Sequence, residues 1–291
     1  MAKKNTDIKK SKGLFAEAMV RLRRNKGAMI GLGIFLVIVL IALLSPVFFD
    51  YETDVIKQDY SQVKLAPCSD HVFGTDEFGR DILARVCWGS RASLAIAAIV
   101  TVIALTIGAV LGSLAGYYGG KVDMVIMRIM DIFMAIPGML LAICIVAALG
   151  PGTEKLCIAL TISSIPSFSR IVRGAVLTVR NSEYVRAATA IGSKDMHIIF
   201  SHVLPNGLAP IIVQTTLRFA TIILSIAGLS FIGLGIQAPQ PEWGSMLANA
   251  RSFIRDYSYM CAFPGLAIMI TILSLNLLGD GLRDALDPRL K

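Results

Sequence analysis

The stretch NSEYVRAATAIGSKDMHIIFSHVLPN, residues 181–206, is a long polar interruption late in an otherwise apolar chain. Its pattern predicts two short helices joined at Gly192, because glycine tolerates positive φ and commonly ends helices. The first helix carries an apolar stripe at helical spacing, formed by Tyr184, Ala187, Ala188 and Ile191. The second repeats this spacing with Met196, Ile199, Phe200 and Val203. Two short amphipathic helices beside a membrane indicate a protein partner.

The ends of these helices also have sequence signals. Ser182 is the predicted N-cap of the first helix, and the charge of Glu183 suits the positive end of the helix dipole. Ser193 is the predicted cap of the second helix, and Pro205 is expected to break it before the next apolar run.

The same stretch resembles the EAA loop of ABC importer permeases, whose pattern is E-A-A, three residues, G, nine residues and I-x-L-P. Five residues fit this spacing, whereas Arg186 stands in place of the glutamate and His202 in place of the isoleucine. The form E-Y-V-x-A-A resembles the peptide and nickel branch of these permeases. The resemblance implies a coupling helix that docks in a cleft of a cytoplasmic ATPase. The implied docking residues are Glu183, Tyr184, Ala187, Ala188, Gly192, Ser193, Asp195, Leu204 and Pro205. An ordinary loop with two surface helices is the alternative.

Composition indicates a polytopic membrane protein. Hydrophobic residues make up 55% of the 291 residues, charged residues 16%, and the mean hydropathy is +0.69. The net charge of +8 comes from basic residues that flank apolar runs, as expected for orientation in a bilayer. We therefore expect a lipid bilayer, and no nucleic acid, as the partner of these charges.

Six apolar runs predict six transmembrane helices, at residues 27–49, 91–117, 124–149, 156–173, 207–236 and 260–278. The first run is too long for a cleaved signal and lacks an A-x-A site, so we expect it to be retained. The predicted organisation is a tail with an amphipathic helix (1–26), the first span with an outer segment (27–88), a core (89–280) and a C-terminal tail (281–291). We also expect a brief helix that begins at residue 279 and stops at Asp287-Pro288.

Charge asymmetry predicts the orientation. Residues 1–26 carry nine Lys or Arg, whereas residues 50–88 carry eight Asp or Glu against four bases. Because basic segments remain on the cytoplasmic side, we expect both termini to be cytoplasmic and the 50–88 segment to be outside.

The outer segment contains a second motif. Phe73 to Asp81 resembles the F-G-T-D-x-x-G-R-D signature of C-type subunits of peptide importers, through Gly74, Thr75, Asp76, Gly79, Arg80 and Asp81. These residues are expected either to form a structural cap over the pore or to contact a binding protein or substrate. We expect residues 81–90 to lie on the outer membrane surface before the second span. Cys68 and Cys87 could pair or remain free thiols.

Several residues inside the predicted spans suggest packing or transport roles. Gly108, Gly112 and Gly116 form a small-residue face that allows close helix packing. Arg128 and Asp131 are expected to pair locally. Pro137 should kink the third span, as a gating joint or for packing. Candidates for the translocation path are Gln214, Arg218 and Pro137, and an acid partner for Arg218 is the alternative.

The sequence has no G-x-x-x-x-G-K-[ST] motif for ATP, no metal-ligand spacing and no catalytic constellation. We therefore expect energy to come from another subunit. The resemblance implies an all-α, polytopic permease subunit with the type I (MetI-like) fold. It would lie in the bacterial cytoplasmic membrane and import dipeptides or oligopeptides. The resemblance also implies a second permease, two ATPases that hold ATP and Mg²⁺, and an outer substrate-binding protein. A permease for nickel or another small solute, and a lone channel or secondary carrier, are the alternatives.

Overall fold

The computed structural model describes the backbone of residues 14–286 and the side chains of residues 18–286. Five described helices are long and apolar enough to cross a membrane: α2 (Lys26–Phe48), α3 (Ile82–Tyr118), α6 (Thr153–Val179), α10 (Leu208–Phe231) and α12 (Tyr259–Leu286). Two more, α4 (Gly120–Met134) and α5 (Gly138–Leu149), amount to a sixth span if the bent pair is counted as one. The predicted all-α class is therefore confirmed for the described residues.

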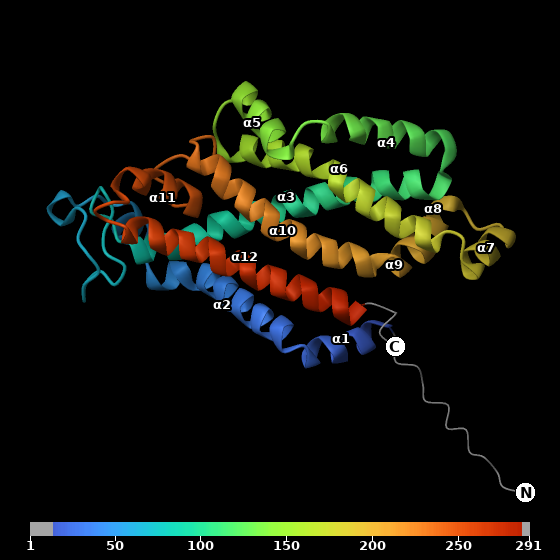
Figure 1. Ribbon diagram of the computed structural model, residues 1–291, viewed down its shortest axis with the longest axis horizontal. Helices are drawn as coiled ribbons and strands as arrows, with labels where there is room; N and C mark the ends of the chain where they lie inside the picture. Colours follow the sequence, from blue (N-terminus) through green and yellow to red (C-terminus); the bar gives the residue numbers. More distant parts are fainter. Residues whose placement is uncertain (1–13, 287–291) are drawn as a thin grey trace, which may run out of the picture.

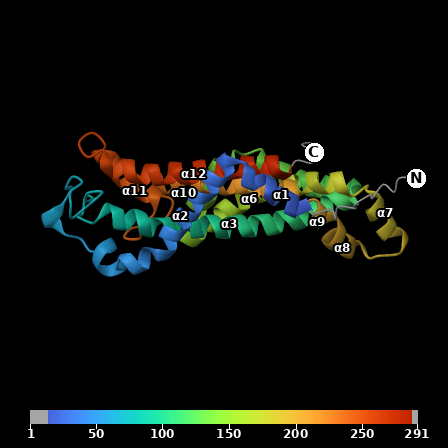
Figure 2. The ribbon, with the colours of Figure 1, turned by 90° about the horizontal axis from the view of Figure 1, so that it is seen from below.

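The long helices lie side by side, and a different structure lies at each end of them (Figure 1). At one end is the foot, residues 183–206, which comprises α7 (Glu183–Ala190), α8 (Asp195–Ile198), a π-helical turn (Ile199–Val203) and α9 (Leu204–Asn206). At the other end is the cap, residues 51–81, with a π-helical turn (Tyr51–Ile56) and a 3-10 turn (Tyr60–Gln62). The short helix α11 (Trp243–Ala250) and a 3-10 turn (Arg251–Phe253) lie beside the cap (Figures 1 and 2).

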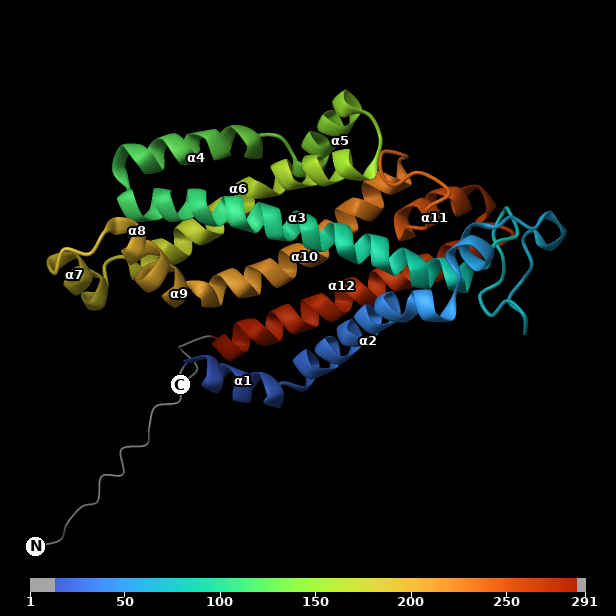
Figure 3. The same cartoon turned by 180° about the vertical axis from the view of Figure 1, so that it is seen from behind.

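The predicted amphipathic helix near the N-terminus is present as α1 (Leu14–Arg24). It lies against the C-terminal half of α12, and together they occupy the side of the molecule nearer the foot (Figure 3). The foot and the last described residues of α12 are thus at the same end, as the charge pattern requires if both are cytoplasmic.

The core is apolar and centres on the contact between α3 and α6. Cβ atoms added at Gly108 and Gly112 would lie 2.6 Å from Phe168 Cβ and 2.4 Å from the Ser169 carbonyl oxygen. At Gly116 the nearest atom would be Val176 Cγ1, at 2.8 Å. The predicted close packing at these glycines is therefore confirmed, and it fixes α6, the helix that leads into the foot, against α3.

Three predicted boundaries are wrong. Residues 81–90 do not form a separate surface segment, because α3 begins at Ile82 and continues to Tyr118. The C-terminal tail does not start a new helix at residue 279, since α12 continues without interruption to Leu286. The predicted stop at Asp287-Pro288 lies outside the described residues. The fifth span ends at Phe231 rather than at residue 236, and the predicted loop after it contains α11.

The third span is broken rather than kinked. Between α4 and α5 the helix axis turns by 80° at a break that includes Pro137. Proline lacks an N–H donor and its ring clashes with the preceding turn, which favours a break at this position. Pro166 and Pro264 lie inside the continuous helices α6 and α12, so the proline alone does not account for the break.

Candidate functional site

The foot has the predicted glycine turn. Gly192 has φ +79°, and its N–H donates to the carbonyl of Thr189 at 3.0 Å. Ser182 takes the predicted N-cap position of α7, but its hydroxyl makes no capping hydrogen bond. The predicted cap of the second helix is wrong, because Lys194 rather than Ser193 takes the N-cap position of α8. Pro205 does not end the second helix either. It lies near the start of α9, where a missing N–H is tolerated, and the winding ends at Gly207.

One face of the foot packs onto the long helices. Val185 and Ala188 of α7 are buried, as are Ile198, Ile199 and Val203. Most of them belong to a cluster with Val172, Ala175 and Val176 of α6 and Ile211 of α10. The Tyr117 hydroxyl at the end of α3 also donates to Asp195 Oδ1 at 3.1 Å. The foot is therefore attached to three transmembrane helices.

The exposed residues of the foot include large apolar side chains among charged ones such as Glu183, Arg186 and Lys194. The four large apolar side chains are 82% (Ile191), 55% (Phe200), 49% (Met196) and 46% (Tyr184) exposed. The residues of each predicted stripe do not all lie on one face. Ala188 and Ile199 are buried, whereas Ala187 is exposed. Of the other predicted docking residues, Glu183 and Pro205 are exposed, and Ser193 and Leu204 are half-buried. These exposed apolar side chains lie where the predicted partner would dock.

The cap, in contrast, is held by buried charges. Arg80 is 3% exposed and its Nε donates to Asp76 Oδ2 at 2.6 Å. Arg85, also 3% exposed, lies with Nε 3.5 Å from the same carboxylate oxygen and donates from Nη1 to the Val55 carbonyl at 2.8 Å. Burial, reinforced by the charge of Asp76, raises the pKa of the nearby Glu77 above its ordinary value.

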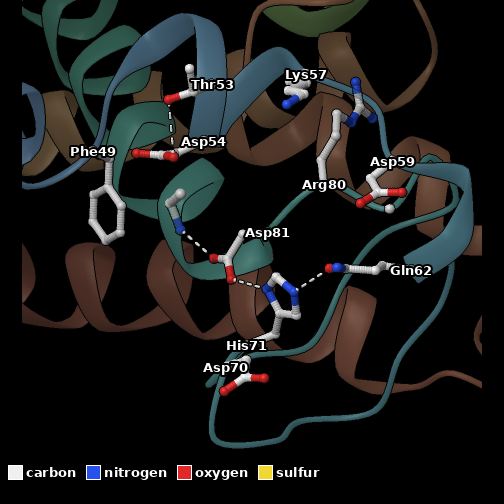
Figure 4. Close-up of a pocket in the computed structure, with 12 residues that line it drawn as sticks. Phe49, Thr53, Asp54, Lys57, Asp59, Gln62, Asp70, His71, Arg80 and Asp81 are labelled. Atoms are coloured by element: carbon white, nitrogen blue, oxygen red, sulfur yellow. Dashed lines mark hydrogen bonds and ion pairs between the residues drawn. The ribbon is translucent and has the colours of Figure 1, made fainter.

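The remaining signature residues of the cap also bond internally, and Figure 4 shows the bonds of Asp81. Asp81 caps α3 by accepting from the Ala84 N–H at 2.8 Å, and its other oxygen lies 2.8 Å from His71 Nδ1. Thr75 Oγ1 accepts from the Leu65 N–H at 2.8 Å. The positive φ values of Gly74 and Gly79 (+78° and +74°) turn the chain between these bonds. Cys68 and Cys87 are free thiols.

The Asp81–His71 pair lines a cavity of about 410 Å³, together with Arg80 and neighbouring residues (Figure 4). Because every polar side chain of the signature has a partner within the cap, the geometry supports the structural role among the two predicted for it.

A second cavity, of about 370 Å³, lies where the α4–α5 break meets α6 and α10. Pro137 and Arg218, two of the predicted path residues, both line it, whereas Gln214 is exposed on α10 and does not. The predicted Arg128–Asp131 pair is wrong. Asp131 instead accepts from Arg170 of α6 at 2.5 Å, a contact between helices that local spacing cannot reveal.

Sequence reasoning missed the burial of two residues beside the cap. Glu242 is fully buried and accepts from the N–H groups of Gly244 and Ser245, both at 2.9 Å. Trp243 is 2% exposed and donates from Nε1 to the Val86 carbonyl at 3.0 Å. Glutamate is not one of the preferred N-cap residues, which explains why no capping signal indicated α11.

Comparison with known proteins gives consistent results. Residues 108–291 match the family described as binding-protein-dependent transport system inner membrane component, and residues 13–67 match the N-terminal transmembrane domain of oligopeptide transport permease C. The chain is 48% identical to the dipeptide transport system permease protein DppC of Alkalihalophilus pseudofirmus, over 94% of this chain and 90% of the relative. It is 41% identical to the oligopeptide transport system permease protein OppC of Bacillus subtilis, over 97% and 92%.

Among solved structures, the fold resembles that of the MetNI methionine ABC transporter in inward-facing conformations. One such structure aligns with a TM-score of 0.59 at 20% identity, over 71% of this chain and 98% of that chain. This likeness supports the fold, and the predicted type I permease architecture is confirmed. The family match over residues 108–291, the sequence relatives and the bundle of long apolar helices agree: the chain belongs to the binding-protein-dependent transport system inner membrane component family, the permease subunits of ABC importers.

Proposed function

We propose that this chain is the permease subunit of an ATP-driven importer of dipeptides or oligopeptides, and that its foot is the docking surface for a cytoplasmic ATPase. The exposed apolar side chains of Ile191, Phe200, Met196 and Tyr184 carry this proposal. Exposed apolar residues gathered on one short segment are typical of protein interfaces. The relatives named as dipeptide and oligopeptide permeases support the substrate class.

The rest of the importer follows from this assignment. Two ATPase subunits hold ATP and Mg²⁺, a second permease of the same fold completes the translocation path, and an outer binding protein delivers the peptide. The foot end is cytoplasmic and the cap end faces outward, in agreement with the basic N-terminal tail and the acidic cap. This chain itself contributes the path and the coupling surface and no catalytic group.

Transmission of movement follows from the attachment of the foot. Because buried side chains join α7 to α6 and α10, a displacement of the foot moves helices that line the second cavity. The ATPase alters transport only if it binds the foot more tightly in one conformation of the permease than in another. A closing ATPase dimer therefore has a mechanical connection to the cavity.

The experiment is reconstitution of the purified complex in liposomes with the outer binding protein and a labelled dipeptide. We expect ATP-dependent uptake, together with an ATPase that copurifies with the wild-type chain. Uptake that persists without ATP, with no ATPase in the preparation, would overturn the proposal in favour of a lone channel or carrier. Uptake of nickel chelates and no peptide would retain the importer and overturn the substrate class.

A further inference from the structure

Arg218 is an unusual residue for its position. It lies near the middle of α10, a predicted membrane-spanning helix, where an arginine is costly unless it faces water or a partner. Its side chain is half-buried and lines the 370 Å³ cavity. Within residues 18–286 it makes no hydrogen bond, ion pair or ring contact. The guanidinium therefore has five donors available inside a cavity.

Among the side chains of residues 18–286, no acid forms an ion pair with Arg218. The lining residues of the cavity, all within the described part of the chain, include no Asp or Glu. The nearest acids along α4 are already engaged, since Asp131 pairs with Arg170 and Asp123 forms a double hydrogen bond with Arg173 at 2.5 and 2.6 Å. The cavity is consequently positive and lacks a counter-charge from these helices.

The other groups in the cavity also favour a negative ligand. Gly138 and Met139, the first two residues of the 12-residue helix α5, line it, and the N-cap of that helix, Pro137, offers no side-chain acceptor. The first N–H groups of a helix have no intrahelical partner and attract anions. Four serines and a threonine complete the polar lining: Ser163, Ser164, Ser167, Ser225 and Thr221.

We propose that this cavity binds a carboxylate of the transported solute, with Arg218 as its charged contact and the start of α5 as its second contact. The inference rests on the proposed function, because a peptide supplies a free C-terminal carboxylate. A guanidinium binds a carboxylate through two parallel N–H···O bonds, which a lysine ammonium cannot reproduce. The 80° break between α4 and α5 has a role in this arrangement: it places the N-terminus of α5 at the cavity rather than within a continuous span.

The first test compares a dipeptide with its C-terminal amide in liposomes that contain the assembled transporter. Uptake of both is measured for the wild type, Arg218→Gln and Arg218→Lys. The uptake rate of each variant is divided by the wild-type rate for the same peptide. Because these variants leave the outer binding protein unchanged, its preference for one of the two peptides cancels in this ratio. We expect Arg218→Gln to reduce carboxylate-peptide uptake about tenfold more than amide uptake, and Arg218→Lys to have a smaller selective effect.

Arg128→Gln is the matched control, since it removes an arginine from α4 that does not line the cavity. It should change the uptake of both peptides by the same factor. An equal loss for both peptides in Arg218→Gln would overturn the carboxylate site and leave the importer assignment intact. Absence of ATP-dependent peptide uptake by the wild type would instead overturn the proposed function.

The second test needs no peptide and no binding protein. Ser225, which lines the cavity, is replaced by cysteine, and its reaction with an anionic and a cationic methanethiosulfonate is measured in the assembled complex. The reaction of the complex without this cysteine is subtracted, because the chain has five free thiols. We expect faster reaction with the anionic reagent, and a drop of about tenfold in the anionic-to-cationic ratio when Arg218→Gln is added. A ratio that is unaffected by Arg218→Gln would overturn the proposal.

Discussion

The foot and the cap lie at opposite ends of the same helices and use opposite chemistry. The cap buries its charges: Asp76, Arg80 and Arg85 are all less than 10% exposed and bond to one another or to backbone carbonyls. The foot instead exposes its large apolar residues, with Ile191 82% and Phe200 55% accessible. The cap also exposes Tyr60 (70%) and Val72 (56%), so the difference lies in its buried ion pairs, which are satisfied within this chain and have no counterpart among residues 183–206 of the foot.

This difference separates two motifs that cannot be told apart in role from the sequence alone. The F-G-T-D-x-x-G-R-D signature forms a buried frame, so its variants should first affect stability. The foot stretch presents residues to the outside, so its variants should affect association while the permease stays folded. Substitutions in the two regions test this separation.

The largest effect is expected for Ile191→Glu or Phe200→Glu. A charge at the centre of an apolar docking surface should weaken ATPase association by about 100-fold, because a few central residues carry most of the binding energy. The thermal stability of the permease should not change, since both side chains are exposed. ATPase copurification and uptake measure the effect, with Ile191→Leu as the control that keeps the site apolar. Full uptake by both charged variants would assign the foot no docking role.

Asp76→Ala should produce the converse result. It leaves Arg80 and Arg85 buried without their carboxylate, and breaking such a pair costs about 3–5 kcal/mol. We expect a clear fall in the thermal unfolding midpoint of the purified subunit. Asp70→Ala, at an exposed acid of the cap, should cost less than about 0.5 kcal/mol. An unchanged midpoint for Asp76→Ala would mean that the signature does not frame the cap.

Gly192→Ala should have a moderate effect confined to the foot. The φ of +79° costs an L-residue about 1–2 kcal/mol, although a Cβ would have open space around it. We expect fewer peptides imported per ATP hydrolysed, with normal insertion, and a stronger effect for Gly192→Pro. Gly174→Ala on α6, also with open space and an ordinary helical φ, should be harmless. If the two alanine variants import the same number of peptides per ATP hydrolysed, the positive φ of Gly192 is not needed for coupling.

Ala188 requires a different interpretation from the one that the motif suggests. Because Ala188 is buried against the long helices, Ala188→Asp should detach α7 from α6 rather than disturb docking alone. We expect faster proteolysis of the 181–206 segment as well as uncoupled ATP hydrolysis, whereas Ala187→Asp, on the exposed side, should uncouple without exposing the segment to protease. Identical proteolysis of the two variants would contradict the two-faced foot.

The smallest effect concerns Glu77 and the pH. Its raised pKa means that the folded cap holds a proton more tightly than the unfolded chain. Stability from this residue is therefore present below its ordinary pKa of 4.5 and is lost as the pH rises through the higher folded value. Glu77→Gln should be more stable than the wild type at pH 7, by less than about 1 kcal/mol, with the difference shrinking towards pH 4.5. Melting curves of both proteins at pH 7 and pH 4.5 check this. A stability difference that is larger at pH 4.5 than at pH 7 would contradict a raised pKa of Glu77.

The sequence predicted the features that depend on local composition. Apolar runs located the long helices, the glycines at 108, 112 and 116 indicated close packing, and Gly192 indicated a turn. Pro137 indicated a disturbed third span, although not its 80° bend, because the bend also depends on how α5 packs against α6.

What failed depends on contacts between distant segments. Asp131 has Arg128 one turn away but pairs with Arg170 on another helix. The inward or outward direction of Ala187 and Ala188 depends on where α6 and α10 lie, and the helical stripe alone placed both on one face. The absence of an acid partner for Arg218 within the described residues could only be seen once the helices were assembled.

The central claim is that the exposed face of the foot contacts an ATPase, and site-specific photocrosslinking in intact membranes tests it most directly. A photoreactive residue is placed at Ile191, and in a parallel sample at Tyr60 of the cap, which is 70% exposed. We expect Ile191 to crosslink to an ATP-binding subunit and Tyr60 not to do so. Crosslinks from Ile191 to lipid or to an outer protein, with none to an ATPase, would contradict the account.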